Sequence, residues 1–350
     1  MDNWGLVALS AAALFAVLVG LAVIYVRMLP ATALARTFVY SFITAAAGTA
    51  AWLALAPFAA AGMPSRVYFP IAVLAGLASF LATLAVRATG AGMVIVVIFA
   101  LVWTALVFVP AALMSFGVTA PLDLEPVDHG GSLAVNVATG SAALGVLLVG
   151  GSKAPRLRVG SLSLPFGALA ALVLTGGWLA WLAAAEFAID EATPGIVVNG
   201  AIGAAGGIVG WLAVQRILHQ STTITGVAAG LMSGLFSIAA GAPLFAPLAA
   251  VAAGLFAGGL ACYVTLRRVR DTRRPQWSIV GSHLVAGGLG VVLLGLLATD
   301  RGFLFTGQIG LLSEQIASTV VTAVYSAGVS YLLWFGLKRL PSHAPARDLA

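Results

Sequence analysis

Apolar residues in this chain occur in long runs that short polar connections separate. An α-helix needs roughly 20 such residues to cross the hydrocarbon core of a bilayer. The pattern therefore predicts an all-α polytopic membrane protein with about eleven spans. We place these spans at about 4–26, 36–61, 68–86, 92–117, 131–150, 162–185, 195–216, 222–240, 245–266, 277–299 and 314–337.

Charge in the connections alternates along the chain. Of the 17 Lys and Arg residues, all but Arg66 and Arg301 fall in every second connection. Acidic residues concentrate in the others: Asp2, Asp123, Glu125, Asp128, Glu186, Asp190, Glu191 and Asp300. Because basic connections are retained on the cytoplasmic side, the pattern predicts a cell-membrane protein with its N-terminus outside and its C-terminus in the cytoplasm.

The connection around 151–160 divides the predicted spans into five before it and six after it. An odd number of spans in the first half places the next span in the opposite orientation to the first. The arrangement predicts two inverted five-helix repeats followed by a final helix, as in many transporters. We expect a single transmembrane domain over residues 1–340 and a short cytoplasmic tail over 341–350.

Composition agrees with a membrane protein, since 61% of the residues are hydrophobic and 8% are charged. Soluble domains carry about 25% charged residues. The net charge of +6 lies in short juxtamembrane clusters rather than on one folded face, so it does not indicate a nucleic-acid partner. The largest cluster, Arg267 to Arg274, either anchors the chain at anionic headgroups or docks a cytoplasmic partner.

Candidate ligands for metals and cofactors are scarce. Cys262 is the single cysteine, which excludes an intrachain disulfide and a cysteine-rich metal site. His283 is the histidine expected at membrane depth, and a catalytic zinc site normally needs three protein ligands. We therefore expect no metal and no cofactor, and a membrane-embedded enzyme is the weakest of the functional hypotheses.

Glycines recur at spacings of three or four residues within several spans. The stripes are Gly203, Gly206 and Gly210, then Gly226, Gly230 and Gly234, then Gly254 and Gly258. Small residues at such spacing allow helix backbones to approach closely in lipid. Bundle packing is the favoured interpretation, with the lining of a narrow pore as the alternative.

Ionisable groups inside or beside the spans are the first candidates for a functional site. The imidazole of His283 either bonds a neighbouring helix or lines a path on which it exchanges a proton. Asp128 precedes the fifth span, where a carboxylate caps a helix N-terminus or stabilises a cation in an outer vestibule. Near the outer ends, Trp4 suits the interfacial aromatic belt, while Phe116, Trp178 and Trp181 suit either the belt or a cage for a small cation.

Several of these segments, in their order along the chain, resemble motifs of the ammonium transporter/Rh family. Asp128-His129-Gly130-Gly131-Ser132 is similar to the segment that opens the fifth helix in that family, and Gly177-Trp178 to its pore segment. Further matches are Val198-Asn199-Gly200, Gly226 to Gly241, and Val280-Gly281-Ser282-His283. With the predicted eleven spans, the resemblance covers nearly the whole chain.

The resemblance implies a homotrimer in which each subunit has its own narrow hydrophobic pore. It places Phe116 and Trp178 at an outer ammonium site, Trp181 near an aromatic gate, Asp128 at the mouth and His283 in a pair of pore histidines. A PII-type cytoplasmic regulator is a further implied partner. The second histidine falls at Val135 or Asn136, so the pair is broken, and Asn136 offers a hydrogen bond without relaying protons.

Other departures from the family are Ala185 in place of a serine, Ala239 or Ala240 in place of a proline, and Leu284 after His283. We expect a channel-like transporter of ammonium or ammonia, because an apolar pore penalises ions and admits neutral ammonia. The alternatives are a transporter of another small polar solute and a non-conducting ammonium sensor or accessory protein of the same fold. The broken histidine pair makes electrogenic transport unexpected.

Overall fold

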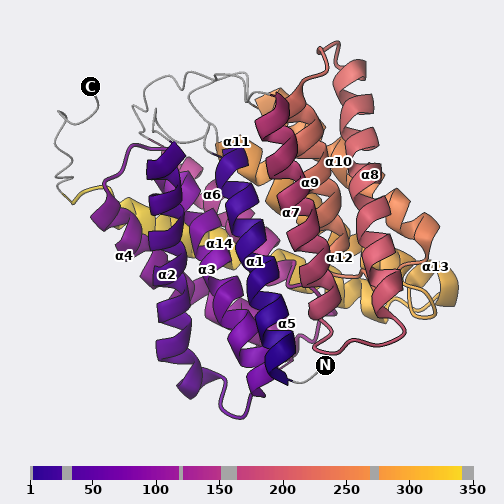
Figure 1. The fold of residues 1–350 in the computed structure, drawn as a ribbon, viewed down its shortest axis with the longest axis horizontal. Coiled ribbons are helices and arrows are strands. Elements are labelled where there is room, and N and C mark those ends of the chain that lie inside the picture. The colour runs from indigo at the N-terminus through magenta and orange to yellow at the C-terminus, as the bar shows by residue number, and fades with distance from the viewer. Residues whose placement is uncertain (1–2, 26–33, 118–120, 151–163, 269–275, 341–350) are drawn as a thin grey trace.

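The computed structural model of this 350-residue chain describes residues 3–25, 34–117, 121–150, 164–268 and 276–340. These residues form a helical bundle in which the two halves of the chain lie side by side (Figure 1). The last long helix, α14 (Gly310–Leu337), contacts elements of both halves.

Helices fill the described part of the chain in an order that confirms the predicted spans. The first half contains α1 (Asn3–Tyr25), α2 (Leu34–Ala59), α3 (Ser65–Arg87), α4 (Met93–Trp103), η2 (Thr104–Phe108), α5 (Val109–Ser115), η3 (Pro121–Asp123), η4 (Leu133–Val137) and α6 (Ala138–Val149). The second half contains α7 (Leu164–Ala184), α8 (Thr193–Ile217), α9 (Ile224–Ile238), α10 (Pro247–Arg268), α11 (Gln276–Ile279), η5 (Val280–Val285), α12 (Ala286–Leu297) and α13 (Phe303–Thr306) before α14.

Length and hydropathy make 9 of these described segments able to cross a membrane on their own. Two shorter apolar helices, Leu133–Val149 and Ile224–Ile238, correspond to the predicted fifth and eighth spans. Boundaries differ from the expected ones by a few residues, which is the usual uncertainty at helix ends.

Three spans contain a π-helical turn, which the apolar pattern did not predict. These turns are η2 in the fourth span, η4 in the fifth and η5 in the tenth. In η4 the backbone N–H of Val137 donates to the carbonyl of Ser132, five residues earlier. π-helical turns insert one residue into a helix, and they occur frequently at functional sites.

Matching contacts recur in the two halves, as two inverted repeats require. The pair α2 and α3 in the first half corresponds to α8 and α9 in the second, and the pair α3 and α6 corresponds to α9 and α12. The first helices of the halves, α1 and α7, pack against each other. The turns η4 and η5 therefore occupy equivalent positions in the two repeats.

Glycine stripes lie where helices of the second half cross. A methyl group added to Gly254 or Gly258 of α10 would collide with the backbone carbonyls of Gly203 or Gly207 on α8. The backbone of Gly207 also contacts that of Gly234 on α9. The predicted packing role of these stripes is confirmed, because most of the absent side chains are replaced by the backbone of a neighbouring helix.

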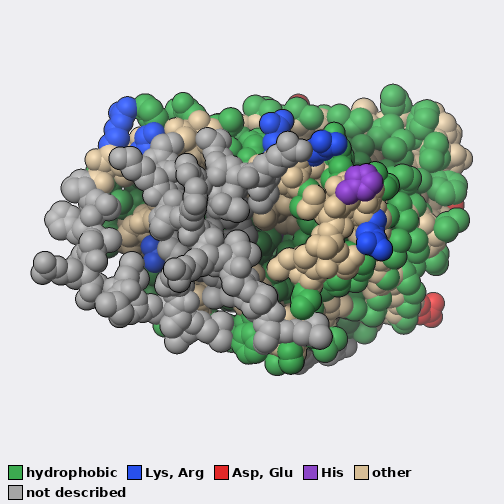
Figure 2. Space-filling view, turned by 90° about the horizontal axis from the view of Figure 1, so that it is seen from above, with side chains coloured by type: hydrophobic (Ala, Val, Ile, Leu, Met, Phe, Trp, Pro, Cys, Tyr) green, Lys and Arg blue, Asp and Glu red, His purple; other side chains and the backbone are tan. Residues whose placement is uncertain are grey.

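Basic residues gather at one end of the bundle. Arg87, Arg216, Arg268 and Lys338 lie at the ends of the third, seventh, ninth and eleventh spans, which all end on the same face because the spans alternate in direction. Figure 2 looks onto this face and shows Lys and Arg side chains on its described part, while the acidic side chains in view lie at the edge. The predictions for Arg27, the side chain of Arg36, Lys153, Arg156, Arg158, Arg270, Arg273, Arg274 and the tail 341–350 lie outside the described residues.

Candidate functional site

His283 lies on η5, and its imidazole is fully buried in the middle of the tenth span. Its Nδ1 atom is 3.1 Å from Oδ1 of Asn136, which lies on η4 and is also fully buried. The structure thereby places Asn136, rather than Val135, opposite the histidine. Polar groups at this depth persist when they are paired, and here the pair joins the two repeats.

Two glycines allow the π-helical turns to approach each other. Gly287 follows His283 by one helical turn, and a Cβ added there would lie 2.6 Å from Cβ of Asn136. Gly140 follows Asn136 by the same interval, and a Cβ added there would collide with the backbone of Leu284. Each turn therefore packs against a glycine of the opposite repeat, and this packing fixes the distance between the amide and the imidazole.

Tyr25, the last residue of α1, contacts the other side of the imidazole. Its hydroxyl is 2.9 Å from Nε2 of His283 and 3.2 Å from Oγ of Ser282. Ser282 in turn donates to the carbonyl of Ser278 at 2.8 Å. Both nitrogens of the imidazole are consequently engaged, one by each of two different spans.

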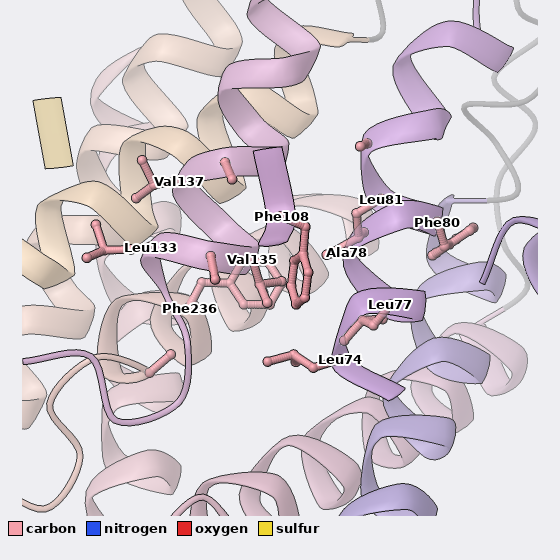
Figure 3. Close-up of a cluster of buried hydrophobic side chains, with 14 of the residues drawn as sticks. Leu74, Leu77, Ala78, Phe80, Leu81, Phe108, Leu133, Val135, Val137 and Phe236 are labelled. Atoms are coloured by element: carbon pink, nitrogen blue, oxygen red, sulfur yellow. The ribbon is translucent and has the colours of Figure 1, made fainter. Parts of the chain in front are cut away.

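A series of aromatic contacts leads from His283 towards the end of the bundle opposite the basic face. The ring of Phe236, on α9, lies 4.4 Å from the imidazole in a stacked arrangement, and the indole of Trp178 lies 5.0 Å from Phe236. Trp178 is fully buried and donates to the carbonyl of Leu235. Figure 3 shows Phe236 in the same buried cluster as Phe108 of η2 and Val135 of η4. These rings fill the space beside His283.

Asp128 anchors the start of η4. Its carboxylate accepts hydrogen bonds from the hydroxyl of Ser115 at 2.6 Å, and from the backbone N–H groups of Ser132 and Leu133. These contacts are those of a helix cap. Burial raises the pKa of Asp128 from 3.8 to about 6, although the hydrogen bonds oppose this change.

The loop that follows Asp128 is held against the end of α9. The backbone N–H groups of His129 and Gly130 donate to the carbonyls of Ala240 and Ala239 at 2.9 Å and 2.7 Å. A Cβ at Gly130 would lie 2.8 Å from the Ala239 carbonyl oxygen, so only glycine fits. Trp181 is fully buried and donates from its indole to the carbonyl of Gly130 at 3.0 Å.

Nε2 of His129 lies 2.8 Å from the carbonyl oxygen of Leu182, which only accepts hydrogen bonds. Nε2 therefore carries the hydrogen. Burial lowers the pKa of His129, and the bond to Leu182 partly opposes this effect. The imidazole is thus fixed to α7, and it ties the loop to the same helix that bears Trp178 and Trp181.

Phe116 lies at the end of the fourth span opposite the basic face, where it is half-buried and meets Phe187 at a ring distance of 6.2 Å. Phe187 directly follows Glu186, whose pKa is raised by burial and by the charge of Asp190. Among the ring pairs of the described residues, Phe116 meets Phe187 and Trp178 meets Phe236. Phe116 and Trp178 thus take part in two separate ring contacts, and their placement at one outer site stays a prediction.

Sequence reasoning missed Tyr25, Phe187 and Phe236, and it named Ser132 within a motif without giving it a role. Phe236 is a large ring in an otherwise glycine-rich span, and Phe187 adopts a positive φ of 54°, which is uncommon for an aromatic residue. The ring of Phe236 was visible in the sequence. The backbone conformation of Phe187, like the contacts of Tyr25 and Ser132, required coordinates. Within the described residues, no group of three His, Cys, Asp or Glu side chains comes together as a metal site would require.

Comparison with known proteins gives one consistent family. The profile of the Ammonium Transporter Family matches residues 75–343. An ammonium transporter of Mycobacterium bovis is 28% identical over 229 residues, which cover 61% of this chain and 48% of that protein. A putative ammonium transporter of Methanothermobacter thermautotrophicus is 27% identical over 246 residues, covering 68% and 60%. The chain thus spans about half the length of the mycobacterial relative.

Solved structures show that the fold is shared over almost the whole chain. A Mep2 double mutant from Candida albicans has a TM-score of 0.83 at 18% identity, covering 97% of this chain and 87% of that one. A structure titled Sensor Amt Protein has a TM-score of 0.80 at 16% identity, covering 97% and 94%. At these identities the likeness concerns the fold alone.

Proposed function

The chain belongs to the ammonium transporter family, and on that premise we propose that it passes ammonia or ammonium through a narrow apolar path in each subunit. The observation that carries the proposal is the contact of His283 with Asn136 at the crossing of the two repeats. A paired polar group at membrane depth, surrounded by apolar rings, marks a solute path in a transporter.

The surroundings of the pair favour a small neutral solute. Phe236 and Trp178 present ring faces and edges between His283 and the outer end, and the Val135 side chain adds a further apolar wall. An ion that sheds its water in such a path loses most of its solvation energy, whereas neutral ammonia loses little. Movement of the rings opens the path, with His283 offering a hydrogen bond to ammonia on its way.

The outer end suits the first contact with the cation. Phe116 and Phe187 form a half-buried aromatic pair next to Glu186, and ring faces attract an ammonium ion by about 0.5–2 kcal/mol. Asp128 contributes to this end by holding the backbone in place, because its carboxylate accepts hydrogen bonds from the N–H groups at the start of η4. Trp181 likewise holds the loop in place, because its indole N–H donates to the carbonyl of Gly130.

Flux in proteoliposomes tests the proposal. The purified protein should speed the uptake of ammonium and of methylammonium over empty vesicles, measured by an enclosed pH dye and by a labelled substrate. His283→Ala removes a hydrogen-bond partner worth about 1–3 kcal/mol at this depth, which corresponds to a loss of flux of roughly 5- to 150-fold. His219→Gln is the matched control, since His219 is exposed at the end of α8.

Absence of flux from a folded wild-type protein would contradict the transport proposal. Ammonium-dependent thermal stabilisation without flux would instead support the sensor alternative. Uptake of a different small polar solute, with no response to ammonium, would support the other alternative.

We propose further that the basic end of the bundle faces the cytoplasm of a cell-membrane protein. Described arginines at the ends of α3, α8 and α10 support this orientation. Family membership supports a homotrimer, with a PII-type regulator as a partner at the cytoplasmic face. Accessibility of single cysteines placed at Ser65 and Lys338 to an impermeant thiol reagent in intact cells tests the orientation, and the mass of the detergent-purified protein tests the trimer.

A further inference from the structure

A continuous series of polar side chains crosses the middle of the bundle. It runs from Tyr25 of α1 through His283 of η5 and Asn136 of η4 to Ser132 at the start of η4. Ser132 and Tyr25 also contact other groups, and these contacts decide which atom donates at each step. The direction of the whole series can therefore be worked out from its ends.

Ser132 fixes one end. Its hydroxyl donates to the backbone carbonyl of Phe236 at 3.3 Å. A hydroxyl has one hydrogen, so towards Asn136 the Ser132 oxygen acts as an acceptor. Nδ2 of Asn136, which lies 3.4 Å from that oxygen, is the donor. The amide is thereby oriented with its Oδ1 atom towards His283.

An amide oxygen only accepts hydrogen bonds, so Nδ1 of His283 must carry the hydrogen in the 3.1 Å contact with Asn136. A neutral imidazole has one N–H group, which leaves Nε2 with a free lone pair. The Tyr25 hydroxyl, 2.9 Å away, donates to this lone pair. Every member of the series is then satisfied.

We infer that Asn136, oriented by Ser132, holds His283 in the Nδ1–H tautomer and directs the Nε2 lone pair at the Tyr25 hydroxyl. Asn136 and Ser132 are positioning residues in this arrangement. The tautomer follows from the contacts alone, and its consequence for permeation rests on the proposed function.

Tyr25 has a second acceptor within reach. Oγ of Ser282 lies 3.2 Å from the Tyr25 hydroxyl, and Ser282 gives its own hydrogen to the Ser278 carbonyl, so that oxygen can accept. Rotation of one O–H bond moves the Tyr25 hydrogen from Nε2 to Ser282. Nε2 then becomes available to an N–H group of the solute, while the Nδ1 side stays fixed by Asn136.

A series in which donors and acceptors are exchanged at each step is also chemically possible, so an experiment can distinguish the two. If the amide turned over, Ser132 would donate to Oδ1, Nδ2 would donate to Nδ1, and Nε2–H would donate to Tyr25, which would donate to Ser282. That series loses the bond from Ser132 to Phe236 and carries the Nε2–H tautomer. The two series therefore differ in which nitrogen of His283 carries the hydrogen, Nδ1 or Nε2.

Solid-state NMR of the full-length protein in bilayers, with histidine labelled by ¹⁵N, measures the tautomer directly. The His283 signals are identified as those missing from the spectrum of His283→Gln. We expect a protonated Nδ1 and an unprotonated Nε2. His129 is the internal reference for the opposite tautomer, because its Nε2 donates to Leu182.

Variants separate positioning from mere folding. Asn136→Leu removes the acceptor for Nδ1–H, so His283 should change to the Nε2–H form, which can still donate to Tyr25. Tyr25→Phe should keep Nδ1–H and move the Nε2 signal further downfield, since that nitrogen loses its hydrogen bond. In each variant an unchanged His129 spectrum shows that the fold persists.

Two results would overturn the inference. One is a wild-type His283 with its hydrogen on Nε2, or with hydrogens on both nitrogens. The other is an Asn136→Leu variant that keeps the Nδ1–H form. Neither readout depends on flux, so a failure here is distinguishable from a failure of the transport proposal.

Discussion

The two π-helical turns η4 and η5 have the same place in the two repeats but different chemistry. Each is followed, one turn later, by a glycine that admits the opposite turn, Gly140 in the first repeat and Gly287 in the second. Yet η4 carries Asn136, and η5 carries His283. The comparison teaches that the repeat preserves backbone geometry, while the side chains at its crossing have diverged.

The turns also differ in how they are anchored. Asp128 accepts the backbone N–H groups at the start of η4, whereas the side chains of η5 bond to Tyr25 of α1 and to the opposite turn. An amide has fixed donors and acceptors, and an imidazole can exchange its hydrogen. The turn anchored by Asp128 thus carries an amide, Asn136, whose donors and acceptors do not change. The turn held by neighbouring side chains carries an imidazole, His283, which can exchange a proton.

Making the two turns alike should have the largest effect. Asn136→His would place a second imidazole opposite His283 and create a pair able to exchange protons. We expect ammonium-driven current on a solid-supported membrane to rise by an order of magnitude or more over wild type, as for a positioned proton-transfer group.

Two further variants control this experiment. Asn136→Gln keeps an amide at the same position and should add no current. A current in the wild-type protein as large as that of Asn136→His would mean that the asymmetry of the two turns does not limit charge transfer.

Removing Asp128, the anchor of η4, should have the next largest effect, visible as a change in how stability depends on pH. The pKa of Asp128 is about 6 in the folded protein and near 3.8 when unfolded. Between these values the folded state binds more protons, so stability should fall as pH rises from about 4 to about 6, by roughly 3 kcal/mol, and then level off. Thermal unfolding in detergent across this range measures the change.

Asp128→Asn should abolish that slope. His129 contributes in the opposite direction, because its lowered pKa makes the folded state gain stability as pH rises towards 6.5. The difference between wild type and Asp128→Asn cancels this contribution. Equal slopes in the two proteins would show that Asp128 does not titrate in this range.

Separating the turns by one methyl group should have the smallest effect. Gly287→Ala would force its Cβ against Asn136, and such overpacking costs about 1–3 kcal/mol. We expect a lower unfolding temperature and a several-fold loss of flux. Gly328→Ala on α14 is the matched control, because nothing lies within 4 Å of a Cβ added there. Equal behaviour of the two variants would mean that the turns can separate without loss.

The sequence determined the spans, their order and the basic face, because burial in lipid imposes length and charge rules that are read locally. It also singled out His283, since an ionisable group within an apolar run is costly and conspicuous. It did not decide between Val135 and Asn136 as the residue opposite. One extra residue in a π-helical turn rotates every later side chain, and no apolar pattern records that rotation.

Contacts between distant spans were decided by the tertiary structure alone. Tyr25 reaches His283 across 258 positions, and Phe236 stacks on it from another helix. Glycine spacing indicated close packing without naming which backbones would meet, and the ring contacts of Phe116 with Phe187 and of Trp178 with Phe236 were not predicted. Hydrogen bonds and ring contacts depend on distances of a few ångström between helices, which local sequence does not encode because each helix is positioned by all of its neighbours.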